Sequence, residues 1–150
     1  MSHARWYPWA LLVLALLGIA ISAVSLFNHY STQETSYCSF DETFNCDLVN
    51  RNIYSNITKI PITLIGLLGY GLIAALSWFA PRNRRTAALL VASALVGLGF
   101  ALYLTYIEAR VLGIWCILCL GSQTIILAIT VLSFVVFFAA GRKQVPVPAK

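Results

Sequence analysis

Charged side chains are scarce in this chain, and their scarcity excludes most soluble folds. Only 10% of the 150 residues are charged, whereas 60% are hydrophobic, and a soluble domain carries roughly 25% charged residues. We therefore expect an integral membrane protein. The length suits one domain and leaves no room for an additional soluble catalytic module. The net charge of +5 comes from arginines and lysines in the connections, so nucleic acid is not an expected partner.

Four long apolar runs reach or exceed the roughly 20 residues that a membrane-spanning helix needs. They predict transmembrane helices over residues 9–27, 60–80, 86–107 and 114–140. The expected fold is therefore all-α, a four-helix membrane bundle with a long loop, residues 28–59, between the first two helices. The first run is longer than the core of a cleaved signal peptide, the alternative for this segment. In the second run, Gly66, Gly69 and Gly71 are expected to form a thin face for close helix contact.

The basic residues of the connections predict the orientation of the bundle. Seven of them fall on one side of the predicted helices: Arg5, Arg82, Arg84, Arg85, Arg142, Lys143 and Lys150. Only Arg51, Lys59 and Arg110 fall on the other side, together with all the acids. Because Lys and Arg concentrate in cytoplasmic connections, both termini, the turn 81–85 and the tail 141–150 are expected in the cytoplasm. The long loop is then extracytoplasmic.

All four cysteines are predicted to lie at this outer face, where disulfides persist. Cys38 and Cys46 belong to the loop, and Cys116 and Cys119 form a Cys-x-x-Cys pair at the start of the fourth helix. Cysteines three apart on a helix lie on one face. Cys116 is expected in the first helical turn, where the helix dipole favours a thiolate. Cys119 is expected one turn deeper, facing an apolar pocket for a quinone head group. The arrangement suggests an electron relay from an outside protein to a membrane carrier.

Less specific interpretations of the cysteines remain open. Zinc sites usually combine two pairs of ligands, each pair closely spaced in sequence. Cys38 and Cys46 are widely spaced in sequence, as Cys38-x7-Cys46, so no metal is expected. A disulfide between these two could simply staple the loop. Cys116 and Cys119 could be two small apolar side chains of a helix. The chain would then be a non-catalytic membrane scaffold with structural disulfides.

The order and spacing of these motifs resemble the vitamin K epoxide reductase family over roughly residues 9–140. The matching features are Cys38-x7-Cys46, Val49 and Tyr54 before Ile60-Pro61, the stretch from Leu64 to Tyr70, and Cys116-Ile-Leu-Cys119. The functionally similar DsbB family has the opposite order, with its Cys-x-x-Cys pair preceding a widely spaced pair. The resemblance is therefore to a bacterial-type vitamin K epoxide reductase homologue without a fused thioredoxin-like domain.

The resemblance implies a role for each cysteine. Cys116 and Cys119 match the active-site pair, with Cys119 next to the quinone. Cys46 matches the cysteine that forms a transient disulfide with Cys116, and Cys38 matches the one that exchanges with an outside thiol protein. Bacterial members oxidise a DsbA-like or thioredoxin-like partner and reduce a quinone of the ubiquinone, menaquinone or vitamin K type. The expected location is the bacterial inner membrane, and the partner is expected to be a separate protein.

Two departures from the family pattern bear on the substrate. Asn52 stands where members often have Ser or Thr, and Gln123 stands where vertebrate members have Tyr. Both amides can donate a hydrogen bond to a quinone carbonyl. The departures favour a plain quinone over vitamin K epoxide, whose reduction is the alternative activity. Trp115 and Tyr103 are further candidates for lining the quinone pocket.

Overall fold

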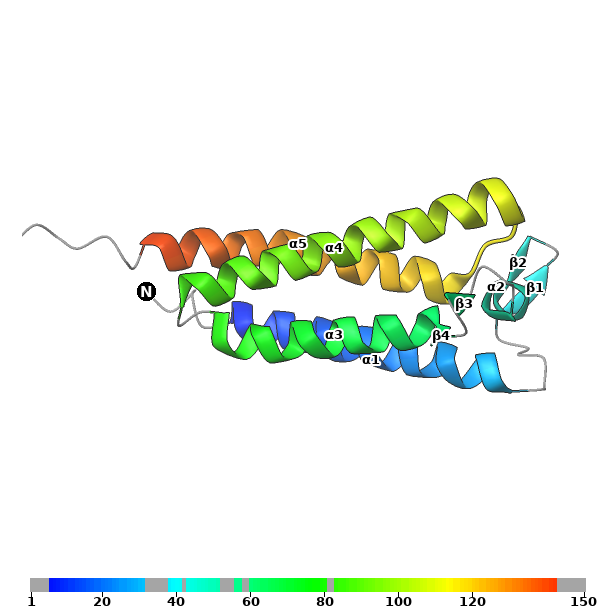
Figure 1. Cartoon of the computed structure of the whole chain (residues 1–150), viewed down its shortest axis with the longest axis horizontal. Coiled ribbons are helices and arrows are strands. Elements are labelled where there is room, and N and C mark those ends of the chain that lie inside the picture. The colour runs from blue at the N-terminus through cyan, green and yellow to red at the C-terminus, as the bar shows by residue number, and fades with distance from the viewer. Residues whose placement is uncertain are drawn as a thin grey trace, which may run out of the picture.

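Four long helices lie lengthwise beside one another in a bundle (Figure 1). The computed structural model describes residues 6–31, 38–41, 43–51, 56–57, 60–80 and 83–142. The long helices are α1 (Tyr7–Tyr30), α3 (Ile62–Phe79), α4 (Arg84–Ile107) and α5 (Ile117–Arg142). All four are long and apolar enough to cross a membrane, which confirms the predicted four-helix bundle. Their ends fall within three residues of the predicted ones.

The segment between α1 and α3 contains short elements that the sequence did not predict. They are β1 (Ser39–Asp41), β2 (Phe44–Asn45), α2 (Cys46–Arg51), β3 (Asn56–Ile57) and β4 (Ile60–Pro61). Strands β1 and β2 form one antiparallel pair, and β3 and β4 form another. All of these elements lie at one end of the bundle, opposite the end where α1 begins and α5 finishes (Figure 1).

Helix α4 continues beyond its predicted end as a single π-helical stretch, η4 (Glu108–Leu112). The predicted helices 86–107 and 114–140 leave residues 108–113 as a connection. Gly113 then takes the left-handed conformation, with φ of 65°, which is a common way to end a helix. Because the chain runs non-helically from Gly113 to Cys116, helix α5 begins only at Ile117. Cys116 therefore lies just before the helix and not in its first turn, and its carbonyl accepts a hydrogen bond from the Leu120 N–H at 3.0 Å.

The tightest glycine contact of the bundle lies between α1 and α3. A Cβ built on Gly18 would lie 2.5 Å from ring carbons of Tyr70. The Tyr70 hydroxyl lies 2.9 Å from the carbonyl oxygen of Ser122 on α5 and donates a hydrogen bond to it. Tyr70 therefore connects three helices, and it can do so because Gly18 leaves room for its ring.

Of the three glycines expected to give α3 a thin contact face, only Gly66 lies close to another helix. A Cβ built on Gly66 would lie 3.2 Å from the Ser22 hydroxyl oxygen, but no atom lies within 4 Å of a Cβ built on Gly69 or Gly71. That expectation is wrong for the latter two residues. The close contact between α1 and α3 is instead provided by the glycine on α1, because the bulky partner, Tyr70, comes from α3.

Replacing Gly18 by Ala should destabilise the bundle, because the new methyl group would overlap the Tyr70 ring. Overpacking of this kind costs about 1–3 kcal/mol, so the midpoint of thermal unfolding in detergent should fall by several degrees. Circular dichroism measures it. Gly71→Ala is the matched control and should leave the midpoint unchanged. Equal midpoints for the two variants would contradict the packing described for Tyr70.

Candidate redox site

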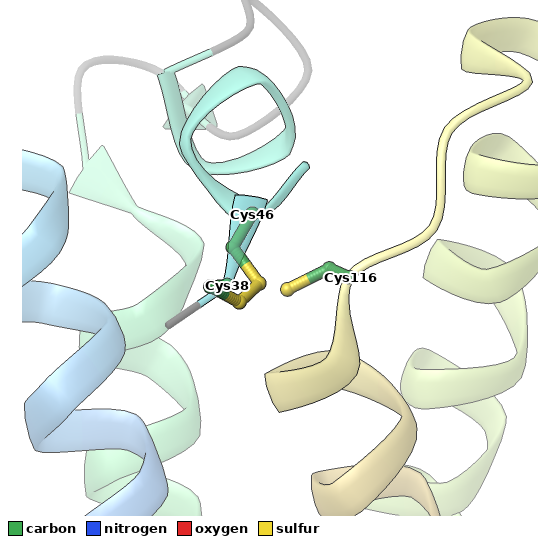
Figure 2. A group of neighbouring side chains, drawn as sticks. All are labelled: Cys38, Cys46 and Cys116. Atoms are coloured by element: carbon green, nitrogen blue, oxygen red, sulfur yellow. A yellow bond between two sulfur atoms is a disulfide. The ribbon is translucent and has the colours of Figure 1, made fainter. Parts of the chain in front are cut away.

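Three of the four cysteine sulfurs meet at the end of the bundle that carries the short loop elements. Cys38 and Cys46 form a disulfide, and Cys116 is a free thiol. The sulfur atoms of these three residues all lie within 4.8 Å of one another. Cys116 points at the disulfide from the segment before α5 (Figure 2). All three side chains are buried, so thiol–disulfide exchange between the loop and Cys116 needs little movement of the chain.

Trp115 fastens the first hairpin to the segment that carries Cys116. Its backbone N–H donates to the carbonyl of Thr43 at 2.8 Å, and its carbonyl accepts from the N–H of Asn45 at 3.2 Å. Trp115 thereby forms an isolated parallel bridge with Phe44 of β2. Because Asn45 directly precedes Cys46 and Trp115 directly precedes Cys116, this backbone contact sets the distance between the two cysteines.

Helix α2, which begins at Cys46, is also tied to α1. The Ser25 hydroxyl donates to the Asn50 side-chain oxygen at 3.0 Å. The Nδ1 atom of His29 lies 2.6 Å from the backbone carbonyl oxygen of Asn50. The Arg51 guanidinium donates to the carbonyl of Ser31. These bonds hold the loop cysteines over the bundle end independently of the contact to Trp115.

Glu108 is a member of the site that the sequence did not predict. Its Oε2 accepts a hydrogen bond from the Cys116 N–H at 3.3 Å, and its carboxyl group is hydrogen-bonded to the Cys119 thiol. The side chain is only 3% exposed, because η4 turns it into the bundle. One signal was present in the sequence: Glu108 is an acid next to a long apolar run, and ionisable residues in membrane segments usually have a function.

The pKa of the Cys116 thiol lies below its usual value. The largest cause is a hydrogen bond with the side chain of Cys119, and the N–H groups of Leu118 and Cys119 add to it. Burial and the nearby charge of Glu108 act in the opposite direction. The sequence predicted that the start of α5 would stabilise this thiolate. The N–H groups there do contribute, but the neighbouring thiol contributes more.

Cys119 lines a cavity of about 570 Å³ between the four long helices. The lining is mostly apolar, and its polar members include Gln123, Thr105, Ser122 and Thr63. Several of its side chains, on α3 and α4, are also exposed on the outside of the bundle: Ile65, Leu72, Leu89 and Val96. The cavity therefore opens on the apolar surface between these helices. The cavity thus offers an apolar space next to the Cys119 side chain.

The four predicted quinone-binding residues have different positions. Gln123 lines the cavity, and its Oε1 accepts a hydrogen bond from Thr105 Oγ1 at 3.0 Å. Trp115 does not line it and contacts the loop through its backbone. Tyr103 does not line it either and is 59% exposed on α4. Asn52 lies outside the described residues. A role in quinone binding stays a prediction for all four.

The cysteine cluster also has the geometry of a partial metal site. Three sulfurs within 4.8 Å of one another can reach one ion, and thiolates are the ligands that zinc prefers. In the described state, however, two of the three sulfurs are bonded to each other and are not thiolates. The expectation of no metal stays a prediction.

Replacing Cys119 by Ala should raise the pKa of the Cys116 thiol, because its largest stabilising hydrogen bond is lost. The alkylation of Cys116 in the fully reduced protein should therefore require a higher pH than in the wild type. Mass spectrometry of the iodoacetamide-treated protein, over a range of pH, measures the shift. Cys119→Ser keeps a hydrogen-bond donor and should lie closer to the wild type. A profile that does not move in Cys119→Ala would show that the neighbouring thiol has no such effect.

Comparison with known proteins agrees with the motifs and the fold. The model of the vitamin K epoxide reductase family matches residues 9–134. The matched segment includes all four cysteines and most of α1, all of α3 and α4, and the first two thirds of α5. A comparison with curated proteins finds no match.

Proposed function

The chain belongs to the vitamin K epoxide reductase family, and we propose that it oxidises a separate thiol protein and passes the electrons to a membrane quinone. Membership implies an oxidoreductase of the membrane that acts on thiols and disulfides. The quinone and the partner are the proposed part. The net reaction converts a partner dithiol and a quinone into a partner disulfide and a quinol.

The grouping of the sulfur atoms carries this proposal. The loop disulfide and Cys116 lie within 4.8 Å of one another, Cys116 is hydrogen-bonded to Cys119, and Cys119 lines the large apolar cavity. The four cysteines therefore form a continuous path from the loop to a compartment suited to a quinone. A static staple of the loop would not require a buried free thiol beside it.

The path allows a balanced sequence of exchanges. A partner thiolate attacks Cys38 and releases Cys46 as a thiolate, and the second partner thiol then frees Cys38. Cys46 attacks Cys116 of the oxidised helix pair and releases Cys119. Cys38 then attacks Cys46, which restores the loop disulfide and releases Cys116. Each exchange breaks one disulfide bond and forms another.

The reduced helix pair finally gives two electrons and two protons to the quinone. The described state, with the loop pair oxidised and the helix pair free, corresponds to the stage before this last step.

The cavity suits a quinone of the ubiquinone or menaquinone type. Its apolar lining and its opening between α3 and α4 fit a ring with a lipid-soluble tail, and Gln123 offers amide N–H donors for a ring carbonyl. Reduction of vitamin K epoxide is the second candidate, because the same thiols would serve it. Supplying the epoxide and the quinone side by side distinguishes the two substrates.

We further propose that the loop faces the outside of a bacterial inner membrane, where a DsbA-like or thioredoxin-like partner can reach it. The positive charges of Arg84 and Arg85 lie at the opposite end of the bundle. The paired rings of Trp9 and Trp78, 6.2 Å apart, lie there too, as aromatic side chains at a membrane interface do. This distribution supports a cytoplasmic position for that end and for both termini.

Proteoliposomes test the relay directly. A reduced DsbA-like protein and ubiquinone are supplied to the wild type and to single Cys→Ala variants at positions 38, 46, 116 and 119. We expect quinol and partner disulfide in equal amounts from the wild type, and loss of turnover in each variant, because each thiol makes or breaks a bond. Cys119→Ala should accumulate a Cys46–Cys116 disulfide. Normal turnover of that variant would favour the scaffold interpretation instead.

Gln123→Leu should weaken quinone binding, because it removes the amide donors at nearly constant volume. A neutral hydrogen bond contributes about 0.5–1.5 kcal/mol, so KM for the quinone should rise by roughly twofold to tenfold. Steady-state kinetics at saturating partner measures it. Thr124→Val, an exposed neighbour on α5, is the control and should leave KM unchanged. An unchanged KM in Gln123→Leu would remove Gln123 from the quinone site.

A further inference from the structure

A second, smaller cavity lies next to the large one. Its volume is about 70 Å³, and its polar lining comes from η4, α1, α2 and α3: Glu108, His29, Ser25, Asn50 and Thr63. Cys119 and Thr63 line both cavities. The small cavity therefore connects the buried carboxyl group of Glu108 with the compartment proposed for the quinone.

Two buried polar atoms of the small cavity have no hydrogen-bond partner among the described residues. They are the hydroxyl oxygen of Thr63 and the Nδ2 atom of Asn50. Buried polar atoms are nearly always hydrogen-bonded, to protein or to ordered water. A polar cavity of this size can hold water, and Thr63 can accept a hydrogen bond on one side and donate one on the other. The lining thus has the groups that a short proton path requires.

Glu108 has the contacts expected of a proton acceptor. It is buried, it is hydrogen-bonded to the Cys119 thiol, and no Arg or Lys within the described part of the chain pairs with it. The other titratable groups that face it are Cys116 from the segment before α5, Cys119 from α5 and, across the small cavity, His29 from α1. A buried carboxylate without a neutralising cation carries a large desolvation cost. Taking up a proton from a neighbouring group removes that cost.

We propose that Glu108 carries the thiol protons of the helix pair to the quinone, through the small cavity and the Thr63 hydroxyl. This inference rests on the proposed function. When the helix pair is oxidised, two S–H bonds break, one S–S bond forms, and two electrons and two protons leave. Glu108 takes the proton of Cys119 and returns it through Thr63 to a quinone oxygen. The proton of Cys116 follows by the same route. Two O–H bonds of the quinol then balance the two lost S–H bonds, and Glu108 ends as it began.

Glu108→Gln tests the proposal, because the amide oxygen can still accept from the Cys116 N–H but cannot take up a proton. Fully reduced protein in nanodiscs is mixed with ubiquinone, and quinol formation and thiol loss are followed over a single turnover. Proton transfer by a positioned side chain typically contributes about 10²–10⁴-fold, so we expect a loss of that size. Glu108→Asp should retain part of the rate of quinol formation, and Thr63→Val should lower that rate. The matched controls Asp41→Asn and Thr124→Val, both at exposed positions, should leave the rate unchanged.

A second readout needs no quinone. The charge of Glu108 raises the pKa of the Cys116 thiol, so in Glu108→Gln the alkylation of Cys116 should begin at a lower pH. A thiol that ionises more readily and yet reduces quinone more slowly is the signature of a lost proton carrier. A purely structural role would instead lower the unfolding temperature and would not be rescued by Asp.

The outcomes separate the inference from the proposed function. If the wild type forms no quinol, the proposed function is wrong, and this inference falls with it. If the wild type forms quinol and Glu108→Gln does so at the same rate, Glu108 carries no proton and the proposed function stands. If Glu108→Gln and Glu108→Asp both unfold early and lose all activity, Glu108 has a structural role and the inference is overturned.

Discussion

Two backbone hydrogen bonds between Trp115 and the first hairpin hold the halves of the redox site together. They set the position of Cys46 and Cys116 at the same time, since each cysteine directly follows one of the bonded residues. With this contact in place, the loop covers the thiols and all three clustered sulfurs are buried. Cys38 is one of them, so the proposed exchange with a partner protein requires the loop to move.

The four helices and the grouping of the cysteines could be predicted from the sequence, because both depend on strong local signals. Long apolar runs identify membrane helices with little reference to the rest of the chain. The spacing of Cys116 and Cys119 indicates one helix face. Cys38 and Cys46 share the only long polar segment. A bundle with alternating helix directions then brings that segment and the start of the fourth helix to the same end.

The details of the site could not be predicted, because they arise from tertiary contacts. The hairpin β1–β2 is short, and its pairing with Trp115 depends on a residue far away in the chain. The π-helical stretch η4 turns Glu108 inward at a point where the polar sequence indicated a connection. Gly113 then delays the start of α5, which leaves Cys116 in front of the helix. The importance of Gly18 was hidden for a similar reason, because its partner Tyr70 belongs to another helix.

The order in which the disulfides appear tests the proposed relay most directly. Fully reduced protein in nanodiscs would be mixed with one equivalent of ubiquinone, quenched with acid at successive times and mapped by mass spectrometry. The Cys116–Cys119 disulfide should appear first, followed by Cys38–Cys46 as the helix pair becomes reduced again. If Cys38–Cys46 forms first while Cys116 and Cys119 remain reduced throughout, electrons do not pass from the loop to the quinone through the helix pair.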